Sequence, residues 1–162
     1  MSVNRGLFTS ASSHWTTPAE LYIEVDKEFH FNDDPCPLIP EWDGLRRPWG
    51  TSSFVNPPYG REIGKWVKKA WMEAEYGDKT IVCLIPSRTD TRWWHDWVMK
   101  AHEIRFLRGR LKFGDATNSA PFPSAIAVFR KQRRQQRGRD YPTWWNDWAL
   151  EVHKETLKAV RG

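Results

Sequence analysis

A tetrapeptide with distinctive chemical groups, Asn56-Pro57-Pro58-Tyr59, follows a short apolar stretch of the chain. The asparagine side-chain oxygen and the carbonyl of the next proline are hydrogen-bond acceptors, and a proline ring limits the directions the backbone can take. Two such acceptors can hold both N–H bonds of an exocyclic amine and make its nitrogen a better acceptor for a methyl group. The second proline stiffens the turn, and the aromatic ring can stack on a base removed from a duplex. The tetrapeptide therefore predicts methyl transfer to a nucleobase amine.

The plainer interpretation of the same residues is a strand followed by a proline-stabilised turn, because Asn-Pro is a common turn dipeptide. The flanking sequence favours the functional interpretation. An apolar strand pattern, Ser53–Val55, comes before the tetrapeptide and a helical pattern comes after it. In α/β folds, ligands bind at the carboxyl ends of sheet strands. The amine loses its proton easily once methylated, so the predicted site needs positioning and electrostatics rather than a strong base.

The elements that must position the tetrapeptide alternate between helix and strand patterns. Helices are predicted from a capping Thr17 with Pro18 to Phe29, from Glu62 to Tyr76, and from Asp90 to Ala101. Prolines between 35 and 50 indicate a long irregular loop. Strands are predicted at residues 31–34, 53–55, 80–85, 104–107, 110–113 and 125–129. This alternation predicts an α/β, Rossmann-like fold of reduced size with a mostly parallel sheet.

Composition and charge limit the class of protein. The sequence predicts a flexible arm (1–14), one domain (15–130), and a basic linker with an amphipathic C-terminal helix (131–162). A net charge of +5 favours a polyanionic partner. Core packing explains most of the 11 tryptophans, and only a few are expected to stack on a ligand. Without a membrane-length apolar run or a signal peptide, the protein is expected to be cytoplasmic. Two separated cysteines and scattered histidines have no metal-binding spacing, so no metal is expected.

Several blocks of sequence, in order along the chain, resemble the phage and prophage DNA N-6-adenine methyltransferases, the small Dam-type family. The resemblance extends from about Ser13 to Phe129 and rests on Trp15-Thr16-Thr17-Pro18, Glu28 to Cys36, Asp43-Gly44-Leu45, Trp49, Phe54 to Tyr59, Leu84 to Thr91, and Gly109 to Phe113. It implies S-adenosylmethionine-dependent methylation of adenine N6 in double-stranded DNA. The target base would be flipped onto four catalytic residues, Asn56, Pro57, Pro58 and Tyr59. It also implies a phage- or prophage-encoded protein acting in a bacterial host cell.

The resemblance further implies a cofactor pocket formed by Trp15, Thr17, Pro18, Asp34, Pro35 and Asp43. A carboxylate at Asp34 would attract the sulfonium or α-ammonium group of the cofactor. The plainer interpretation of Asp34 is a turn residue at the end of a strand. The chain departs from the wider methyltransferase pattern after Asp34-Pro35, where it has Cys36-Pro37-Leu38 in place of a Gly-x-Gly loop.

Basic side chains near predicted strand ends and in the run from Arg130 to Arg139 are candidates for phosphate contacts. The candidates are Arg88, Arg110, Lys112, Arg133 and Arg134, with Arg92, Arg105 and Arg108 as further possibilities. For any one of them, a solvated surface arginine or lysine is the plainer interpretation. Three alternative functions stay open: an RNA adenine methyltransferase, a glutamine-amide methyltransferase, and a non-catalytic DNA-binding protein on a methyltransferase fold. The sequence does not indicate the recognition sequence or the oligomeric state.

Overall fold

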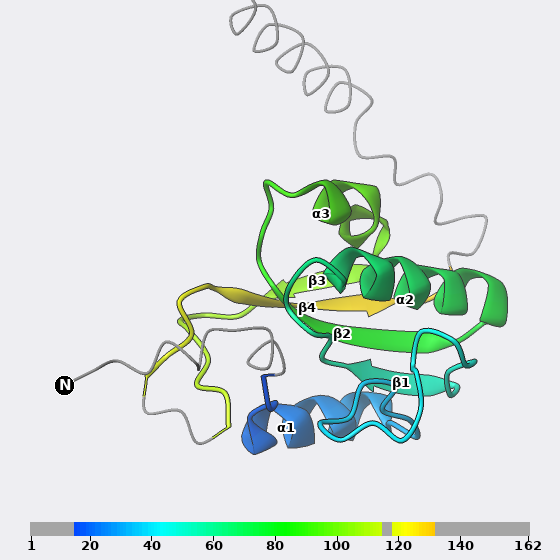
Figure 1. Cartoon of the computed structure of the whole chain (residues 1–162), viewed down its shortest axis with the longest axis horizontal. Coiled ribbons are helices and arrows are strands. Elements are labelled where there is room, and N and C mark those ends of the chain that lie inside the picture. The colour runs from blue at the N-terminus through cyan, green and yellow to red at the C-terminus, as the bar shows by residue number, and fades with distance from the viewer. Residues whose placement is uncertain (1–14, 115–117, 132–162) are drawn as a thin grey trace, which may run out of the picture. The chain divides into compact units, whose positions relative to one another are not determined.

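The computed structural model describes residues 15–114 and 118–131. Within these residues a four-stranded sheet is combined with three α-helices and one 3-10 helix (Figure 1). In chain order the elements are α1 (Ala19–Phe29), β1 (Ser52–Val55), α2 (Ile63–Gly77), β2 (Thr80–Pro86), α3 (Arg92–Asp96), η3 (Val98–Lys100), β3 (Glu103–Phe106) and β4 (Ser124–Phe129). The predicted combination of helices and strands, an α/β class, is therefore confirmed.

The strands lie in the order β1-β2-β4-β3. β1 and β2 are parallel and are connected through α2, whereas β4 is antiparallel to both of its neighbours. β1, β2 and β3 consequently run in one direction and β4 runs in the other. The prediction of a mostly parallel sheet is wrong. β3 and β4 form an antiparallel pair that needs no helical crossover, and β4 inserts between β2 and β3.

The apolar run of β2 is buried because both faces of the sheet are covered. Ile81, Cys83 and Ile85 belong to a core shared with α2 and α3, whereas Val82 and Leu84 belong to a second core shared with α1. Successive strand residues point to opposite faces, so an uninterrupted apolar strand requires a layer of structure on each side. The fold is thus three layers, with α1 on one face of the sheet and α2 and α3 on the other.

The predicted helix that follows the tetrapeptide is confirmed to within one residue at each end, as α2. Its buried side recurs at helical spacing and comprises Ile63, Trp66, Val67, Ala70 and Ala74. This face anchors the helix on the sheet next to β2. The start of α2 is therefore fixed close behind the tetrapeptide that ends β1.

The predicted strand at residues 110–113 is absent, and the segment is a loop instead. Gly109 and Gly114 lie on either side of it with φ of 78° and 54°, which are left-handed values that break a strand. The carbonyl of Leu111 accepts a hydrogen bond from the N–H of Ala120 at 2.8 Å. The segment therefore closes on its own loop instead of joining the sheet.

Two other predicted elements are shorter than expected. Residues 31–34 contribute only an isolated parallel bridge between Asp33 and Ser53. The prolines that follow lack the N–H needed to continue a ladder. The helix predicted from Asp90 to Ala101 is divided into α3 and η3 at Trp97, whose φ of −128° and ψ of −49° are not helical.

The predictions for the arm at 1–14, for the basic run from residue 132 onward and for the C-terminal helix lie outside the described residues. In the part of the chain that the structure describes, no helix has both the length and the apolar character needed to cross a membrane.

The loop that carries Gly44 gives a sharp stability prediction. A Cβ at Gly44 would lie 2.0 Å from the carbonyl oxygen of Pro35 and 2.7 Å from the Trp66 ring. We expect Gly44→Ala to lower the free energy of unfolding by about 1–3 kcal/mol, the usual cost of overpacking. Denaturant unfolding measures this change. Gly60→Ala is the matched control, because nothing lies within 4 Å of the Cβ it adds. Equal stabilities of the two variants would contradict the tight packing at Gly44.

Candidate active site at one edge of the sheet

The shared direction of β1, β2 and β3 brings their carboxyl ends to one edge of the sheet, where the reversed β4 begins (Figure 1). Asn56 follows β1 directly, and Ser87 follows β2. Backbone hydrogen bonds join these ends: Ser87 N–H donates to the carbonyl of Pro123 at 2.9 Å, and Leu107 N–H donates to that of Ser124 at 3.1 Å. The tetrapeptide therefore lies at the edge where α/β proteins bind ligands.

The side-chain amide of Asn56 is held by a segment about forty residues earlier in the chain. Its Nδ2 donates hydrogen bonds to the backbone carbonyl of Trp15 and, at 3.0 Å, to Oγ1 of Thr17. A carbonyl can only accept, so the nitrogen of the amide, and not its oxygen, must face Trp15. The orientation of the amide is therefore determined by its partners.

The oxygen of this amide is left without a hydrogen-bond donor in the part of the chain that the structure describes. Oδ1 of Asn56 is buried and has no hydrogen-bond partner among the described residues. Leaving a buried acceptor unpaired usually costs about 1–3 kcal/mol, so such atoms commonly indicate a ligand or solvent partner. An amine N–H is the kind of group that would satisfy this oxygen.

The rest of the tetrapeptide is fixed in the core. Pro57 is fully buried. The hydroxyl of Tyr59 donates to the carbonyl of Leu84 at 3.1 Å, and burial raises the pKa of Tyr59 well above its usual value. Its ring meets Phe113 and Phe122 nearly at right angles, with centroids 6.0 and 5.5 Å apart. Tyr59 is therefore a neutral aromatic group held in one orientation by a hydrogen bond and two rings.

A pocket of about 310 Å³ opens beside Asn56, and this volume is at the lower end of the range for small-molecule sites. Aromatic rings from three segments form much of its wall, and one carboxylate lies among them. The lining residues are Trp15, Thr16, Thr17, Ala19, Tyr22, Ile23, Asp34, Cys36, Leu38, Phe54 and Asn56. The pocket thus combines flat apolar surfaces with a single negative charge.

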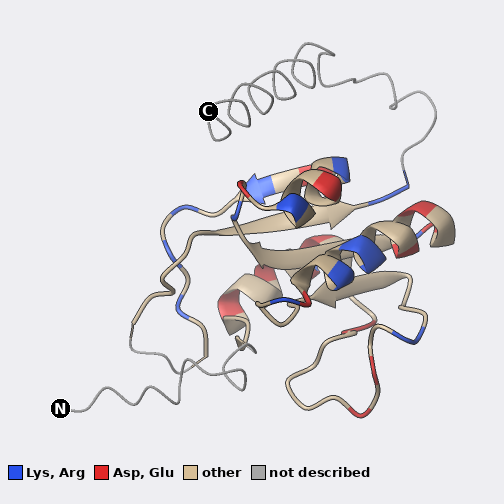
Figure 2. Cartoon of the chain, turned by 45° about the horizontal axis from the view of Figure 1, so that its top comes forward, with Lys and Arg blue, Asp and Glu red and all other residues tan. Residues whose placement is uncertain are grey.

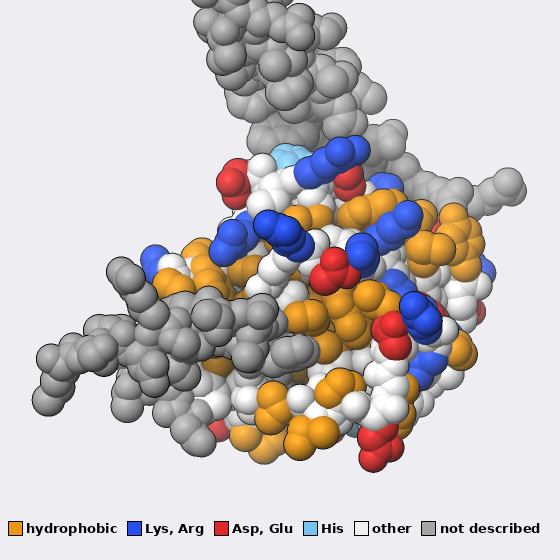
Figure 3. Space-filling view, viewed as in Figure 1, with side chains coloured by type: hydrophobic (Ala, Val, Ile, Leu, Met, Phe, Trp, Pro, Cys, Tyr) orange, Lys and Arg blue, Asp and Glu red, His pale blue; other side chains and the backbone are white. Residues whose placement is uncertain are grey.

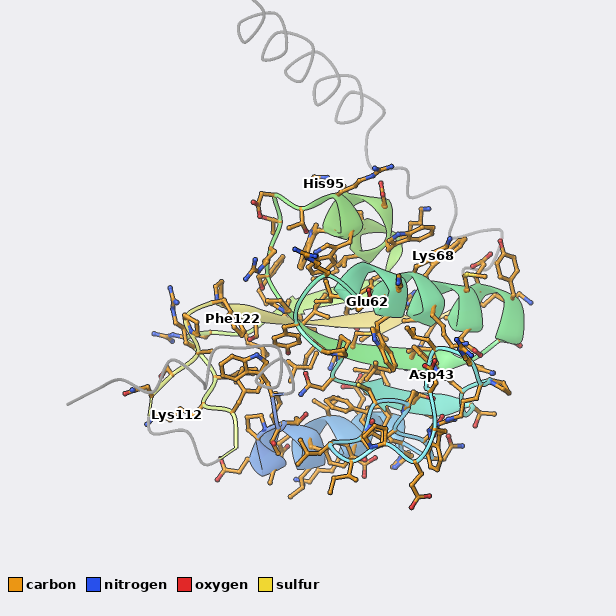
Figure 4. All side chains as sticks on the ribbon, in the orientation of Figure 1. Asp43, Glu62, Lys68, His95, Lys112 and Phe122 are labelled. Carbon is orange, nitrogen blue, oxygen red and sulfur yellow. The ribbon has the colours of Figure 1, made fainter. Side chains whose placement is uncertain are left out.

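The structure brings together three of the six residues predicted to bind the cofactor. Trp15, Thr17 and Asp34 line the pocket with Asn56. The others do not line it: Pro18 is the N-cap of α1, and Pro35 is fully buried. Asp43 is exposed and pairs with Arg46 at 3.1 Å, far from Lys112 and Phe122 in Figure 4.

Thr17 does not have the capping role that the sequence predicts. The N-cap of α1 is Pro18, without a side-chain hydrogen bond, and the helix begins at Ala19. The Thr17 hydroxyl instead accepts from Asn56. Sequence reasoning also missed Tyr22, Ile23 and Phe54 as pocket residues. Their only signal is apolar spacing, which core packing explains equally well.

Two consecutive aspartates have different environments at the pocket. Burial raises the pKa of Asp33, but hydrogen bonds from Arg47 at 2.7 and 3.0 Å and from Gly50 N–H at 2.7 Å outweigh it, so the net pKa is lowered. Desolvation and the nearby charge of Asp33 raise the pKa of Asp34, although the N–H of Cys36 donates to its Oδ1 at 3.0 Å and the side chain is exposed at the pocket. Asp33 anchors the loop after residue 35, whereas Asp34, which among the described residues has no cationic partner as close as Arg47 is to Asp33, presents its carboxylate to the pocket.

Burial also raises the pKa of the Cys36 thiol to about 12. At neutral pH this thiol is protonated, so it contributes a small apolar surface to the pocket and no nucleophile.

A smaller pocket, of about 140 Å³, lies on the Tyr59 side of the edge. Its lining includes Tyr59, Pro86, Trp93 and the exposed Arg88. The two pockets therefore have different members of the tetrapeptide in their walls, Asn56 in one and Tyr59 in the other.

The basic residues predicted to contact nucleic acid lie mostly near the same edge. Arg110 and Lys112 are exposed in the loop between β3 and β4. Arg133 and Arg134 lie outside the described residues. Arg105 is not free for phosphate: it makes hydrogen bonds of 2.6 and 2.7 Å to Glu28 of α1 and also pairs with Glu103.

Charge is distributed unevenly over the helices. Figure 2 shows the mainly acidic α1 and the lysines of α2, and Figure 3 shows lysines and arginines gathered over α2 and α3. A polyanion would be repelled by the α1 side of the molecule and attracted to the opposite side and to the β3–β4 loop.

A larger groove of about 620 Å³ on α2 is a weaker candidate for the active site. Its lining has no predicted catalytic residue and comprises Leu45, Lys65, Lys68, Lys69, Met72, Glu73, Tyr76 and Gly77. Two of its lysines form ion pairs, Lys65 with Glu62 at 2.8 Å and Lys69 with Glu73 at 2.7 Å. Across residues 15–114 and 118–131, no group of three or more His, Cys, Asp and Glu side chains is arranged to hold a metal ion.

The fold and the site together define an α/β protein with an Asn-Pro-Pro-Tyr turn and a ligand pocket at the carboxyl edge of its sheet. Residues 7–140 match the family model described as DNA N-6-adenine-methyltransferase (Dam), and the chain belongs to this family. It is 25% identical to the DNA N-6-adenine-methyltransferase of Haemophilus phage HP1 (strain HP1c1), over 71% of this chain and 77% of the phage protein. No solved structure matches the chain. The resemblance found in the sequence is thus confirmed.

The contrast between the two aspartates predicts opposite effects of the same substitution. Asp33 has a lowered pKa in the fold, so its stabilisation is present above the unfolded value of 3.8 and is lost as the pH falls toward the folded value. We expect Asp33→Asn to reduce the free energy of unfolding at neutral pH by about 1.5–3 kcal/mol, the range for hydrogen bonds to charged groups. The loss should shrink in acid. Urea unfolding at several pH values measures it.

Asp34→Asn is the matched control. Its folded pKa is raised, so the ionised carboxylate destabilises the fold, and the amide should leave stability unchanged or increase it at neutral pH. A loss of stability as large as that of Asp33→Asn would contradict the assignment of Asp33 as the anchor.

Proposed function

We propose that this protein transfers the methyl group of S-adenosylmethionine to N6 of adenine in double-stranded DNA. The observation that carries the proposal is the open acceptor of Asn56: a buried Oδ1 without a partner in the described part of the chain, on an amide whose nitrogen is held from behind. The family supports the reaction class, because its description names DNA and adenine N6. The phage HP1 relative carries the same name.

Asn56 and Pro57 are the residues that would hold the target amine. Oδ1 of Asn56 would accept one N–H of the amine and the carbonyl of Pro57 the other. Accepting both N–H bonds would draw the nitrogen lone pair out of conjugation with the ring, and the methylated amine would then release its extra proton to water. The chain supplies positioning and electrostatics, and no strong base is required.

The pocket beside Asn56 fits the proposed cofactor. Trp15, Tyr22 and Phe54 offer flat surfaces to an adenosyl group, and Asp34 offers a carboxylate to a cationic one. When bound, S-adenosylmethionine supplies an electrophilic methyl group on a sulfonium. Thr17 and Asn56 also line this pocket, so the bound cofactor would lie next to the acceptor amide of Asn56.

Tyr59 is the proposed stacking platform for a base flipped out of the duplex. Its hydrogen bond to Leu84 holds the ring, and Trp93 lies in the same small pocket. That pocket is smaller than the usual range for ligand sites, so a base would have to displace the exposed Arg88. Arg88, Arg110 and Lys112 would contact phosphates, together with Arg133 and Arg134 in the basic tail.

The decisive experiment is transfer of a labelled methyl group from S-adenosylmethionine to DNA, RNA and protein in parallel, with N6-methyladenine identified in the DNA. We expect label in DNA only, and Asn56→Ala to lower kcat by about 100-fold or more, the scale seen when one preorganised polar group is lost. Calorimetry should show that the cofactor affinity of this variant falls much less. Label found only in RNA or only in protein would show that the methyl acceptor is not DNA.

Asn32→Ala provides a matched control for Asn56→Ala. Asn32 makes hydrogen bonds to Thr51 and Ser52 at the opposite end of β1. This variant should lose stability but retain kcat close to that of the wild type. A comparable loss of kcat in both variants would indicate a general structural effect rather than a catalytic role for Asn56. Failure of the wild type to bind S-adenosylmethionine at millimolar concentration would instead favour a non-catalytic DNA-binding protein.

The carboxylate of Asp34 makes the proposed cofactor affinity dependent on pH. A cationic ligand binds the ionised form, so affinity should fall as the pH drops below neutrality through the pKa of Asp34, which is raised above 3.8. Asp34→Asn should bind roughly tenfold more weakly at neutral pH, the scale of one partly screened charge contact, and should lose this pH dependence.

Asp43→Asn is the control for this measurement, because the same charge is removed outside the pocket. Calorimetric titration of the three proteins measures the effect. Equal cofactor affinity in wild type and Asp34→Asn at neutral pH would remove Asp34 from the cofactor site.

A further inference from the structure

We propose that Thr17 is a positioning residue for Asn56, and that the strap formed by Trp15, Thr16 and Thr17 sets the direction in which the catalytic acceptor points. The inference rests on the proposed function and adds a role for Thr17 beyond lining the cofactor pocket. Its starting observation is that both hydrogen bonds from Asn56 Nδ2 go to this strap.

The two acceptors on the strap perform different tasks. The Trp15 carbonyl cannot donate, so it fixes which end of the amide faces the strap. A threonine hydroxyl can donate or accept, so Thr17 alone would tolerate either end. By accepting the second N–H at 3.0 Å, however, Thr17 prevents the amide from swinging about its remaining bond. With both N–H groups engaged, Oδ1 is left on the side away from the strap, without a partner among the described residues.

The strap is itself held at both ends, as an orienting device must be. The Trp15 ring packs on Phe113 and Phe122, with centroids 5.2 and 5.6 Å apart. The carbonyl of Thr16 accepts from Gly114 N–H at 2.9 Å. On the other side, Pro18 begins α1, where its carbonyl accepts from Tyr22 N–H at 3.1 Å.

These contacts give the strap little freedom to follow the amide, so the amide must follow the strap. A reversed amide would present N–H groups to the incoming amine, which also carries N–H groups, and no hydrogen bond could form between them. Correct orientation is therefore a condition for activity rather than only for stability.

Two isosteric and near-isosteric variants test this role. Thr17→Val keeps the shape of the side chain and removes the acceptor, whereas Thr17→Ser keeps the hydroxyl and removes one methyl group. We expect Thr17→Val to lower kcat for DNA methylation roughly five- to twenty-fold, the effect of losing one net hydrogen bond. Its KM for DNA and its cofactor affinity by calorimetry should stay close to wild type, and its thermal midpoint should fall by no more than the few degrees that one hydrogen bond contributes. Thr17→Ser should recover kcat to within about twofold.

Three outcomes would overturn the proposal. The first is an unchanged kcat in Thr17→Val, and the second is an equal loss in Thr17→Ser, which would assign the effect to packing of the methyl group. The third is a loss confined to cofactor affinity, which would make Thr17 a cofactor-contacting residue only.

A second readout does not depend on activity. In ¹H–¹⁵N spectra the side-chain amide of Asn56 is identified by its disappearance in Asn56→Ala. One of its two proton resonances should move toward the position of a free amide in Thr17→Val and stay in place in Thr17→Ser. Unchanged resonances in Thr17→Val would contradict the hydrogen bond from the Asn56 amide to Thr17. If the wild type methylates no DNA, the proposed function fails, while these spectra still decide whether Thr17 orients Asn56.

Discussion

The paired hydrogen bonds from the Asn56 amide join two parts of the chain that are far apart in the sequence and that also meet through the packing of α1 on β1. They tie the carboxyl end of β1 to a strap that precedes α1, with sequence separations of 41 and 39 residues. The pocket beside Asn56 exists because the strap is held there, since Trp15, Thr16 and Thr17 form one of its walls. The same contact therefore shapes the pocket and directs the acceptor.

Two neighbouring residues, Asp33 and Asp34, have different roles at this pocket. Asp33 has a structural role. Both of its oxygens accept hydrogen bonds from Arg47 and Gly50, and these bonds hold the proline-rich loop in place. Asp34 lines the pocket, where desolvation and the charge of Asp33 raise its pKa. Alternation along an extended chain explains how adjacent carboxylates reach different surroundings.

Features set by local sequence could be predicted, whereas those set by distant contacts could not. The α2 helix, the buried β2 strand and the turn at Asn56 follow from periodicity and proline chemistry within a few residues. The reversed direction of β4 does not, because the apolar pattern of a strand buried on both faces is the same in either direction. Thr17 was misassigned for a related reason: a threonine before a proline indicates a helix cap, and only the fold reveals that its hydroxyl is already used by Asn56.

The residues of the candidate site also fall into those that local sequence could predict and those that it could not. Asn56 and Asp34 carry recognisable chemistry and were predicted to act, and the structure places both at one pocket. Asp43 was selected by resemblance alone and lies outside that pocket. The aromatic wall residues Tyr22 and Phe54 could not be distinguished from core residues, since the same spacing serves both purposes.

The reversed β4 has one consequence for how such a protein can diversify. The connection between β3 and β4, residues 107–123, leaves the sheet at the active edge and returns to the same edge. Phe113, Gly114 and Phe122 in this loop are tied to the strap and to Tyr59. Its exposed positions can change without altering the register of any strand, because changes in a surface loop cost little free energy. The sheet and the hydrogen bonds between Asn56 and the strap are constrained by packing, while the exposed part of this loop, with Arg110 and Lys112, is the part of the edge most free to change.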